Sequence, residues 1–278
     1  MIEAAQLGPP TDVRGLFPRE RSALLDLLGE LDAGDWDRAT VCPSWTVKDV
    51  TAHLLHDDLR RLASRRDGHQ GPRPAAGVPL AAFLDRVNQE WVAAARDLST
   101  RQLVELLTDT GEQVAAMWRA MDPDAQGAPV SWAGLEPAPA WLDAARELSE
   151  YWTHQQQLRD ATGRPGLADA GLLAAVLDTF LRALPFTLRD TETEAGTQLQ
   201  VDVTGAAPMR WVATRQDRGW FLDRGVAGRP AATLEVDGDT LWRVCTRNIT
   251  PEDARDRVRV AGDRRLAEQA LRMVSIVR

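Results

Sequence analysis

The stretch that organises this chain is Ala145-Arg-Glu-Leu-Ser-Glu-Tyr-Trp-Thr-His-Gln-Gln-Gln-Leu-Arg-Asp-Ala-Thr-Gly163. Its pattern predicts a helix in which Glu150 and His154 are four residues apart. Both side chains then leave the same face of the helix, within reach of one metal ion. A third ligand would complete an open catalytic site. The best candidate is His53, far upstream in Thr51-Ala-His-Leu-Leu-His-Asp-Asp58.

Spacing alone favours a less specific interpretation. Apolar residues gather on one side of the predicted helix, and Glu150 and His154 fall roughly opposite them. A Glu/His pair on the polar face of a helix is more often a solvated i,i+4 contact than a metal site. The simplest interpretation of His53 is likewise a partly buried histidine bonded to Asp57. Helical spacing therefore leaves the metal site as one of two alternatives.

The residues after His53 raise two further questions. His56 is expected at the surface, although His53 and His56 at i,i+3 could also share a metal. Asp58 falls on the side of its helix that carries Leu54 and Leu55. A carboxylate in that position should either line a cavity or pair with an arginine.

The composition is that of an ordinary soluble globular protein, with 44% hydrophobic and 27% charged residues among 278. This length suits two domains. The net charge of −8, without an offsetting basic block, argues against nucleic acid and anionic membranes as partners. The first ten residues lack the features of a signal peptide, and we find no segment with the roughly 18 apolar residues of a membrane span. We therefore expect a cytoplasmic protein.

Cysteine and lysine usage adds two expectations. Cys42 and Cys245 lie far apart in a chain too large to need a disulfide, so both are expected to be reduced thiols. Lys48 is the only lysine, and the other 32 of the 33 basic residues are arginines. Because arginine codons are GC-rich and lysine codons are AT-rich, the source genome is expected to be GC-rich.

Residues 1–165 are predicted to form a helical bundle with long crossover connections. Leucine periodicity predicts a helix from Pro18, and Ser44 and Ser99 are the expected N-caps of two later helices. Loops rich in proline and glycine separate the helices. The predicted helices cover about residues 18–34, 44–66, 80–97, 99–118 and 139–161.

Residues 166–278 are predicted to form a small α+β domain, which makes the whole chain an α+β protein of two domains. A helix over about residues 168–184 precedes the first strand. Short runs rich in β-branched and aromatic residues, separated by turn residues, predict four strands. These are residues 198–203, 209–213, 219–222 and 232–236, and helical segments follow from residue 239.

Three stretches resemble a known family. Cys42-Pro-Ser-Trp-Thr-Val-Lys-Asp-Val-Thr-Ala-His53-Leu resembles the Cys-Pro-Gly-Trp-Thr-Val-x-Asp-Val-x-x-His-Leu signature of the mycothiol-dependent maleylpyruvate isomerase family, within the DinB-like superfamily. The segment from Trp141 through Glu150-x-x-x-His154 to Pro165 resembles that family's second signature. The C-terminal motifs Leu241-Trp-Arg, Pro251-Glu-Asp-Ala254 and Val260-Ala-Gly-Asp263 are similar to the sterol-carrier-like domain that often follows it.

The resemblance implies a DinB-like four-helix bundle and a sterol-carrier-like C-terminal domain. It also implies that His53, Glu150 and His154 hold a divalent metal, usually zinc, in an internal cleft. Gln157 departs from the family pattern, which commonly has an aspartate there; a neutral amide can hydrogen-bond but supplies no charge. Asp57, Asp58 and Gln157 are the residues expected to line the site or support its ligands.

The resemblance further implies a metal-dependent enzyme with mycothiol as cosubstrate. The thiol would be activated as a thiolate for addition to an electrophilic small molecule, giving either cis–trans isomerisation or S-transfer. Mycothiol is the main small thiol of actinobacteria, whose genomes are typically GC-rich, in agreement with the arginine bias. The alternative is a noncatalytic protein that binds metal and a small ligand. Cys42 and Trp45, in the first signature, are interpreted as packing residues.

Overall fold

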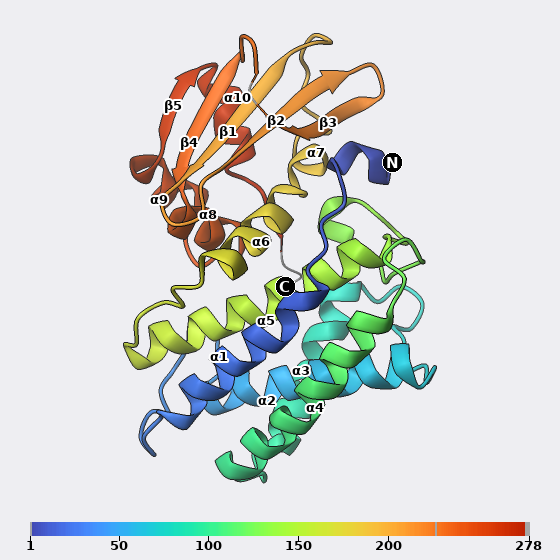
Figure 1. Cartoon of the computed structure of the whole chain (residues 1–278), viewed down its shortest axis with the longest axis vertical. Helices are drawn as coiled ribbons and strands as arrows, with labels where there is room; N and C mark the ends of the chain where they lie inside the picture. The colour runs from blue at the N-terminus through green and yellow to red at the C-terminus, as the bar shows by residue number, and fades with distance from the viewer. Residues whose placement is uncertain (1, 226, 276–278) are drawn as a thin grey trace. The chain divides into compact units, whose positions relative to one another are not determined.

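The computed structural model of the chain describes residues 2–225 and 227–275 (Figure 1). Its backbone contacts divide these residues into two compact units. The helical unit consists of residues 13–121 and 150–168, and the sheet unit consists of residues 2–12, 122–149 and 169–275. The predicted α+β fold class is confirmed. The units do not coincide with a single cut at residue 165, so the domains 1–165 and 166–278 stay a prediction.

The helical unit is built from four helices and part of a fifth. Helix α2 packs against α3 and α4, and α1 packs against α4. Phe17 at the start of α1 stacks on Trp118 of α4, with ring centroids 5.6 Å apart. These helices are α1 (Phe17–Gly29), α2 (Val47–Arg61), α3 (Leu80–Ala95), α4 (Thr100–Ala120) and the second part of α5 (Ala140–Thr162). The predicted helices are present, with two differences. Helix α1 ends at Gly29, before the predicted stop at Gly34, and the α-helical part of α2 ends at Arg61, where a π-helical turn, Leu62–Arg66, follows it.

Helix α2 begins later than predicted. Thr46 is the N-cap: its hydroxyl accepts a hydrogen bond from the Asp49 amide, and the Asp49 carboxylate accepts one from the Thr46 amide. Ser44 instead lies in the preceding turn with a φ of 66°. The prediction of Ser44 as the cap was wrong because serine and threonine cap about equally well, and only the Asp49 partner distinguishes them.

Replacing Thr46 by alanine is expected to lower the free energy of unfolding by about 1 kcal/mol, because the backbone N–H of Asp49 at the start of α2 loses the hydroxyl that accepts its hydrogen bond. The matched control is Ser44→Ala, which removes a hydroxyl without a capping role and should change stability by less than about 0.5 kcal/mol. Urea unfolding of both variants measures the difference. An equal loss in the two variants would contradict the assignment of Thr46.

A buried polar network lies inside the helical unit. The guanidinium of Arg21 on α1 donates two hydrogen bonds to the carboxylate of Asp58 on α2, at 2.7 and 2.9 Å, and a third to the backbone oxygen of Leu107. The hydroxyl of Thr110 donates to the same carboxylate at 2.5 Å. Of the two predicted alternatives for Asp58, pairing with an arginine is the correct one.

The carboxyl group of Glu20, next to Arg21, is buried with fewer hydrogen bonds than that of Asp58. Its Oε1 accepts a hydrogen bond from Gln155 on α5 at 3.2 Å, while Oε2 is buried without a hydrogen-bond partner among the described residues. Burial raises the pKa of the Glu20 carboxyl from 4.5 to about 7, even though Arg21 acts in the opposite direction. The folded protein therefore holds this proton over a pH range in which the unfolded chain has released it.

Because the folded pKa of Glu20 is the higher one, its contribution to stability is complete below about pH 4.5 and is lost as pH rises to about 7. The loss is about 3 kcal/mol for a shift of this size. Glu20→Gln should therefore be more stable than the parent at pH 8, and the difference should shrink toward pH 4.5. Urea unfolding across this range measures the effect. The control is Glu30→Gln at the exposed end of α1, and a parallel pH profile for Glu20→Gln and the parent would contradict the prediction.

The sheet unit contains a five-stranded sheet in the order β3-β2-β1-β4-β5 (Figure 1). Strands β1 and β4 are parallel, and the other neighbours are antiparallel. The strands are β1 (Gln198–Thr204), β2 (Met209–Gln216), β3 (Gly219–Arg224), β4 (Ala232–Asp237) and β5 (Arg259–Gly262), and the helices are α6 (Ala170–Leu181), α7 (Leu184–Thr187), α8 (Gly238–Cys245), α9 (Pro251–Ala254) and α10 (Arg264–Ala270). The four predicted strands are present. The edge strand β5 was missed because it is short, largely exposed and lacks apolar alternation.

One segment is more apolar than the sequence analysis recognised. Residues Ala170–Thr187 have a mean hydropathy of 1.4, so by length and composition alone they could span a membrane. In the structure 61% of this segment is buried, and the side chain of Arg182 within it is fully buried and paired with Asp178. These features are those of a core helix. Cytoplasmic localisation itself stays a prediction.

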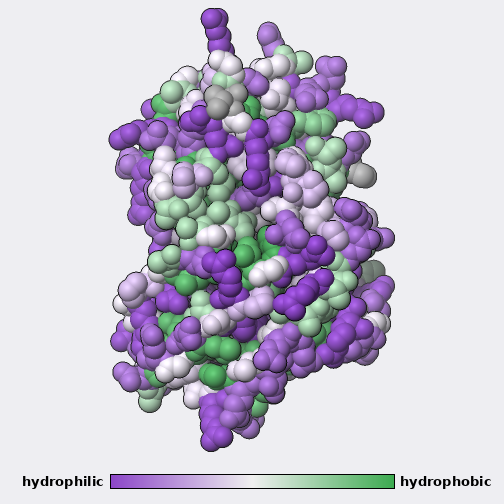
Figure 2. Space-filling view, in the orientation of Figure 1, coloured by the Kyte–Doolittle hydropathy of each residue, from purple (hydrophilic) through white to green (hydrophobic). Residues whose placement is uncertain are grey.

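The face shown in Figure 2 is covered mainly by polar and charged residues, with smaller apolar areas between them. Both cysteines are free, as expected; Cys245 is buried and Cys42 is partly exposed.

Candidate metal centre

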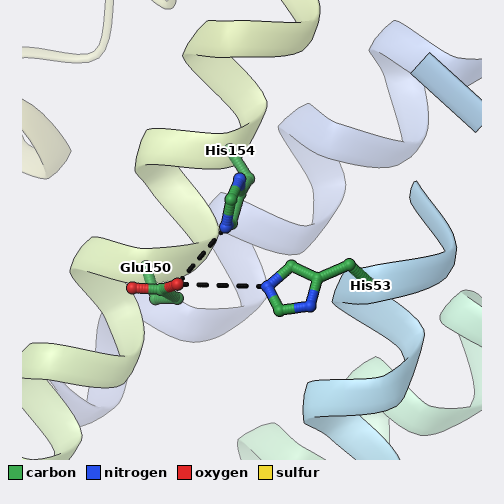
Figure 3. A group of neighbouring side chains, drawn as sticks. All are labelled: His53, Glu150 and His154. Carbon is green, nitrogen blue, oxygen red and sulfur yellow. Dashed lines mark hydrogen bonds and ion pairs between the residues drawn. The ribbon is translucent and has the colours of Figure 1, made fainter. Parts of the chain in front are cut away.

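Three predicted ligand residues come together in the helical unit. His53 projects from α2, and Glu150 and His154 project from successive turns of α5 (Figure 3). Nε2 of His154 lies 3.3 Å from Oε1 of Glu150, and Nε2 of His53 lies 4.0 Å from the same oxygen. One ligand atom from each residue lies within 4.8 Å of the other two. Both imidazole side chains are buried, whereas the carboxylate is about one-fifth exposed.

Gln157, one turn after His154, orients the second imidazole. Its Oε1 lies 2.8 Å from Nδ1 of His154. An amide oxygen can only accept, so Nδ1 carries a hydrogen. When the ring is neutral, as a metal ligand must be, the Nε2 lone pair therefore faces Glu150 and His53. Gln157 thus contacts His154 through a specific hydrogen bond, although its role toward a metal stays a prediction.

Cys42 and Trp45 also reach this centre, which the sequence analysis did not predict. The thiol of Cys42 donates to Oε1 of Gln157 at 3.2 Å, so this oxygen accepts from both Cys42 and His154. The Trp45 ring packs against the His53 imidazole with centroids 5.1 Å apart. The turn that contains Ser44 places both residues beside α2, and their occurrence in the same short signature as His53 was the available signal.

His53 is held differently from His154. Its Nε2 lies 3.4 Å from Oδ2 of Asp57, while its Nδ1 is buried without a hydrogen-bond partner among the described residues. The ring is therefore oriented by Trp45 and Asp57. Asp57 lies beside His53, and its role in the site stays a prediction, whereas the carboxylate of Asp58 pairs with Arg21 and Thr110 instead.

The prediction that His56 lies at the surface was wrong. The residue is 8% exposed, and its ring stacks on Trp91 with centroids 4.9 Å apart. Burial, together with the nearby charge of Arg60, lowers the pKa of the His56 imidazole from 6.5 to about 4. His56 is not a member of the cluster that His53 forms with Glu150 and His154.

The electrostatics of the cluster favour positive charge beside Glu150. Burial alone would raise the pKa of the Glu150 carboxyl, but hydrogen bonds with His154 and His53 outweigh it and hold this pKa far below its ordinary value. Burial likewise opposes charge on His154, but interactions with Cys42 and Glu150 raise its pKa well above the usual range. Glu150 is thus ionised and needs a cationic partner, either a protonated imidazole or a metal ion.

The donor set fits a divalent transition metal. Two imidazole nitrogens and one carboxylate oxygen, with an open position, are ligands that catalytic zinc sites use. Hydrogen bonding of the outer nitrogen of His154 is also typical of a metal-bound histidine. The protein is thus an α+β protein whose long helices bring together a His/Glu/His cluster as a candidate metal centre.

Comparison with known proteins gives the family. The family model of the mycothiol maleylpyruvate isomerase N-terminal domain matches residues 17–159, just over half of the chain. The protein therefore belongs to this family, as the two signatures predicted. A search of curated sequences gives no significant match.

Two solved structures of one enzyme share the fold of this chain. A point mutant of mycothiol-dependent maleylpyruvate isomerase covers 89% of this chain and 91% of its own, with a TM-score of 0.54 and 13% identity. A second structure of that enzyme covers 83% and 86%, with a TM-score of 0.52 and 13% identity. Sterol carrier protein 2 like 2 from Aedes aegypti covers 35% of this chain and 95% of its own, with 15% identity and a TM-score of 0.29.

We expect Gln157→Leu to weaken binding of a divalent metal by about 10- to 100-fold, because His154 loses the acceptor that fixes its ring. Gln157→Asp should retain or exceed the parental affinity for the metal. A carboxylate accepts the same hydrogen bond from Nδ1 and makes the imidazole a more basic metal ligand. Gln156→Leu is the matched control, because Gln156 is equally buried and bonds to the Leu167 amide instead. Competition with a chromophoric chelator measures all three, and equal affinities for the two leucine variants would refute the role of Gln157.

Proposed function

We propose that this protein is a metal-dependent enzyme that uses a small thiol, mycothiol, as cosubstrate. The observation that carries the proposal is the convergence of His53, Glu150 and His154 within 4.8 Å in a member of this family. The structural relatives are named as a mycothiol-dependent isomerase, which supports the choice of thiol and of reaction class. The proposed electrophile is a small molecule with an electron-poor double bond or an equivalent reactive carbon.

Each residue of the centre has a part in this proposal. His53, Glu150 and His154 would hold the cation, for which zinc is the first candidate. A bound divalent metal with an open position would lower the pKa of a coordinated thiol and stabilise its thiolate. Gln157 keeps the His154 lone pair directed inward, and Trp45 covers one side of His53. Asp57, whose carboxylate is partly exposed beside His53, is placed to accept the thiol proton and pass it to solvent.

The chemistry then has two outcomes. Sulfur adds to one carbon of the double bond, which becomes a single bond and can rotate. If the C–S bond breaks again, the double bond re-forms with the opposite geometry, and the net reaction is cis–trans isomerisation. If the C–S bond persists and the neighbouring carbon is protonated, the net reaction is S-transfer. The names of the structural relatives favour isomerisation as the first reaction to test.

The test uses untagged full-length protein reconstituted with zinc. The protein is incubated with mycothiol and either a maleyl-type acid or an epoxide, and the products are followed by proton NMR and mass spectrometry. We expect catalytic isomerisation or adduct formation that requires both the metal and the thiol. The control is His56→Ala, which removes a buried histidine outside the cluster. Stoichiometric metal binding without turnover of either electrophile class would overturn the enzyme proposal and favour a noncatalytic binding protein.

A further inference from the structure

The sheet unit contains a pocket of about 490 Å³ that the metal centre does not explain. One wall is formed by α6, with Ala174, Ala175 and Asp178, and another by the first residues of β2, including Trp211. Arg224, at the end of β3, lines it as well. The volume lies in the range of pockets that hold small organic ligands.

Arg224 and Asp178 line this pocket, and Arg182, which pairs with Asp178, adds a second positive charge beside it. Asp178 is buried, and its carboxylate accepts from two guanidinium groups, Arg182 at Oδ2 and Arg224 at Oδ1, at 2.7 and 2.8 Å. Two positive charges therefore share one negative charge. This cluster has an excess of one positive charge, in a protein whose total charge is −8.

The two arginines differ in how many of their donors are used. Arg182 is fully buried and also donates to the backbone oxygens of Asp178, Leu7 and Pro9. Within residues 2–225 and 227–275, the guanidinium of Arg224 donates only to Asp178, through Nη2, and the side chain is 56% exposed. A guanidinium has five N–H donors, so Arg224 retains several for a ligand. Arg210, which also lines the pocket, is paired with Asp202 on β1.

Arg224 is also held in place. Its guanidinium lies over the Trp211 ring, with Cζ 5.1 Å from the ring centroid, while Asp178 fixes one edge. A restrained guanidinium loses less freedom when it binds a carboxylate in the planar, two-bond geometry that arginine favours. Behind it, Ala174 and Ala175 leave space on the α6 side, because their side chains end at Cβ.

We propose that this pocket binds a compact organic carboxylate, whose anionic group pairs with Arg224 and whose apolar body fills the space beside Ala174, Ala175 and Trp211. The ligand class follows from the single excess positive charge, the apolar small residues and the limited volume. The site belongs wholly to the sheet unit and is separate from the residues of the proposed metal centre.

Calorimetric titration of the full-length, chelator-treated protein tests this inference. The probes are benzoate, its neutral analogue benzamide, and decanoate as a long-chain acid. We expect benzoate to bind at least about 10-fold more tightly than benzamide, because a charge-assisted hydrogen bond is roughly twice as strong as a neutral one. Arg224→Gln should remove that preference, and Ala175→Leu should weaken both benzoate and benzamide by filling the pocket.

The control is Arg259→Gln, which removes an exposed arginine paired with Glu235 elsewhere in the same sheet and should leave benzoate binding unchanged. Thermal unfolding of each variant shows whether it is folded; the partly exposed position of Arg224 makes a large loss of stability unexpected. Four results would each overturn the proposal: no saturable benzoate binding up to about 10 mM, a preference for benzoate that persists in Arg224→Gln, unchanged binding in Ala175→Leu, or tighter binding of decanoate than benzoate.

Discussion

Replacing His154 by alanine is expected to lower the affinity for zinc by more than about 100-fold and to abolish thiol-dependent turnover. Changing an outer partner of a metal ligand already lowers affinity by about 10- to 100-fold, and loss of a direct ligand should exceed that. Gln157 also orients His154 toward Glu150. Alanine at position 154 therefore removes a metal-binding nitrogen and leaves Gln157 without the imidazole that it orients.

The sharpest comparison is with His56→Ala. Both histidines are buried, but His56 stacks on Trp91 and does not belong to the cluster. We expect His56→Ala to affect stability while leaving metal stoichiometry and turnover intact. Elemental analysis, chelator competition and the mycothiol assay are run on the same preparations. If His154→Ala bound zinc as tightly as His56→Ala, the cluster would not be the metal site.

The second large effect is on stability. Asp58→Ala should lower the free energy of unfolding by about 3 to 5 kcal/mol, because it leaves the Arg21 guanidinium buried without its counter-ion. Thr110 would lose its acceptor as well. Urea unfolding at pH 7 measures the loss. Asp57→Ala is the control, since Asp57 is the adjacent residue but is partly exposed.

A double variant separates the charge from the packing. Replacing Arg21 by Met and Asp58 by Leu removes both charges together and should recover most of the stability lost in Asp58→Ala, because paired buried charges can often be exchanged for apolar groups of similar size. A double variant no more stable than Asp58→Ala would show that the pair itself, and not the unpaired charge, accounts for the effect.

Local sequence patterns predicted the helices and most of the sheet. Leucine periodicity located α1, and Ser99 was correctly identified as the cap of α4, since its hydroxyl accepts from the Gln102 amide. The exposed edge strand β5 carries no such pattern. The choice between Ser44 and Thr46 depended on the residue three positions later, which is Asp49 after Thr46 and Val47 after Ser44. Only Asp49 has a side chain that can accept the reciprocal hydrogen bond.

The candidate site could be predicted only in part, because local spacing does not show which distant segments come into contact. The spacing of Glu150 and His154 places them on one face of a helix, but nothing in that spacing identifies His53 as their neighbour; the family signature supplied it. The approach of Cys42 to Gln157 depends on a turn in which Ser44 has a positive φ. The local sequence does not predict this conformation. Asp58 could be assigned to an arginine in general, but the identity of Arg21 required the three-dimensional structure, in which Arg21 on α1 reaches Asp58 on α2.

The origin of the ligands on α2 and α5 has a consequence for metal choice. Two of the three proposed donors, Glu150 and His154, are fixed relative to each other by the rise and turn of one α-helix. The remaining variable is the distance from that helix to His53 on α2. Ions of different radius would therefore be distinguished by a single spacing between two helices, and substitutions packed between α2 and α5 would shift metal preference without altering any ligand.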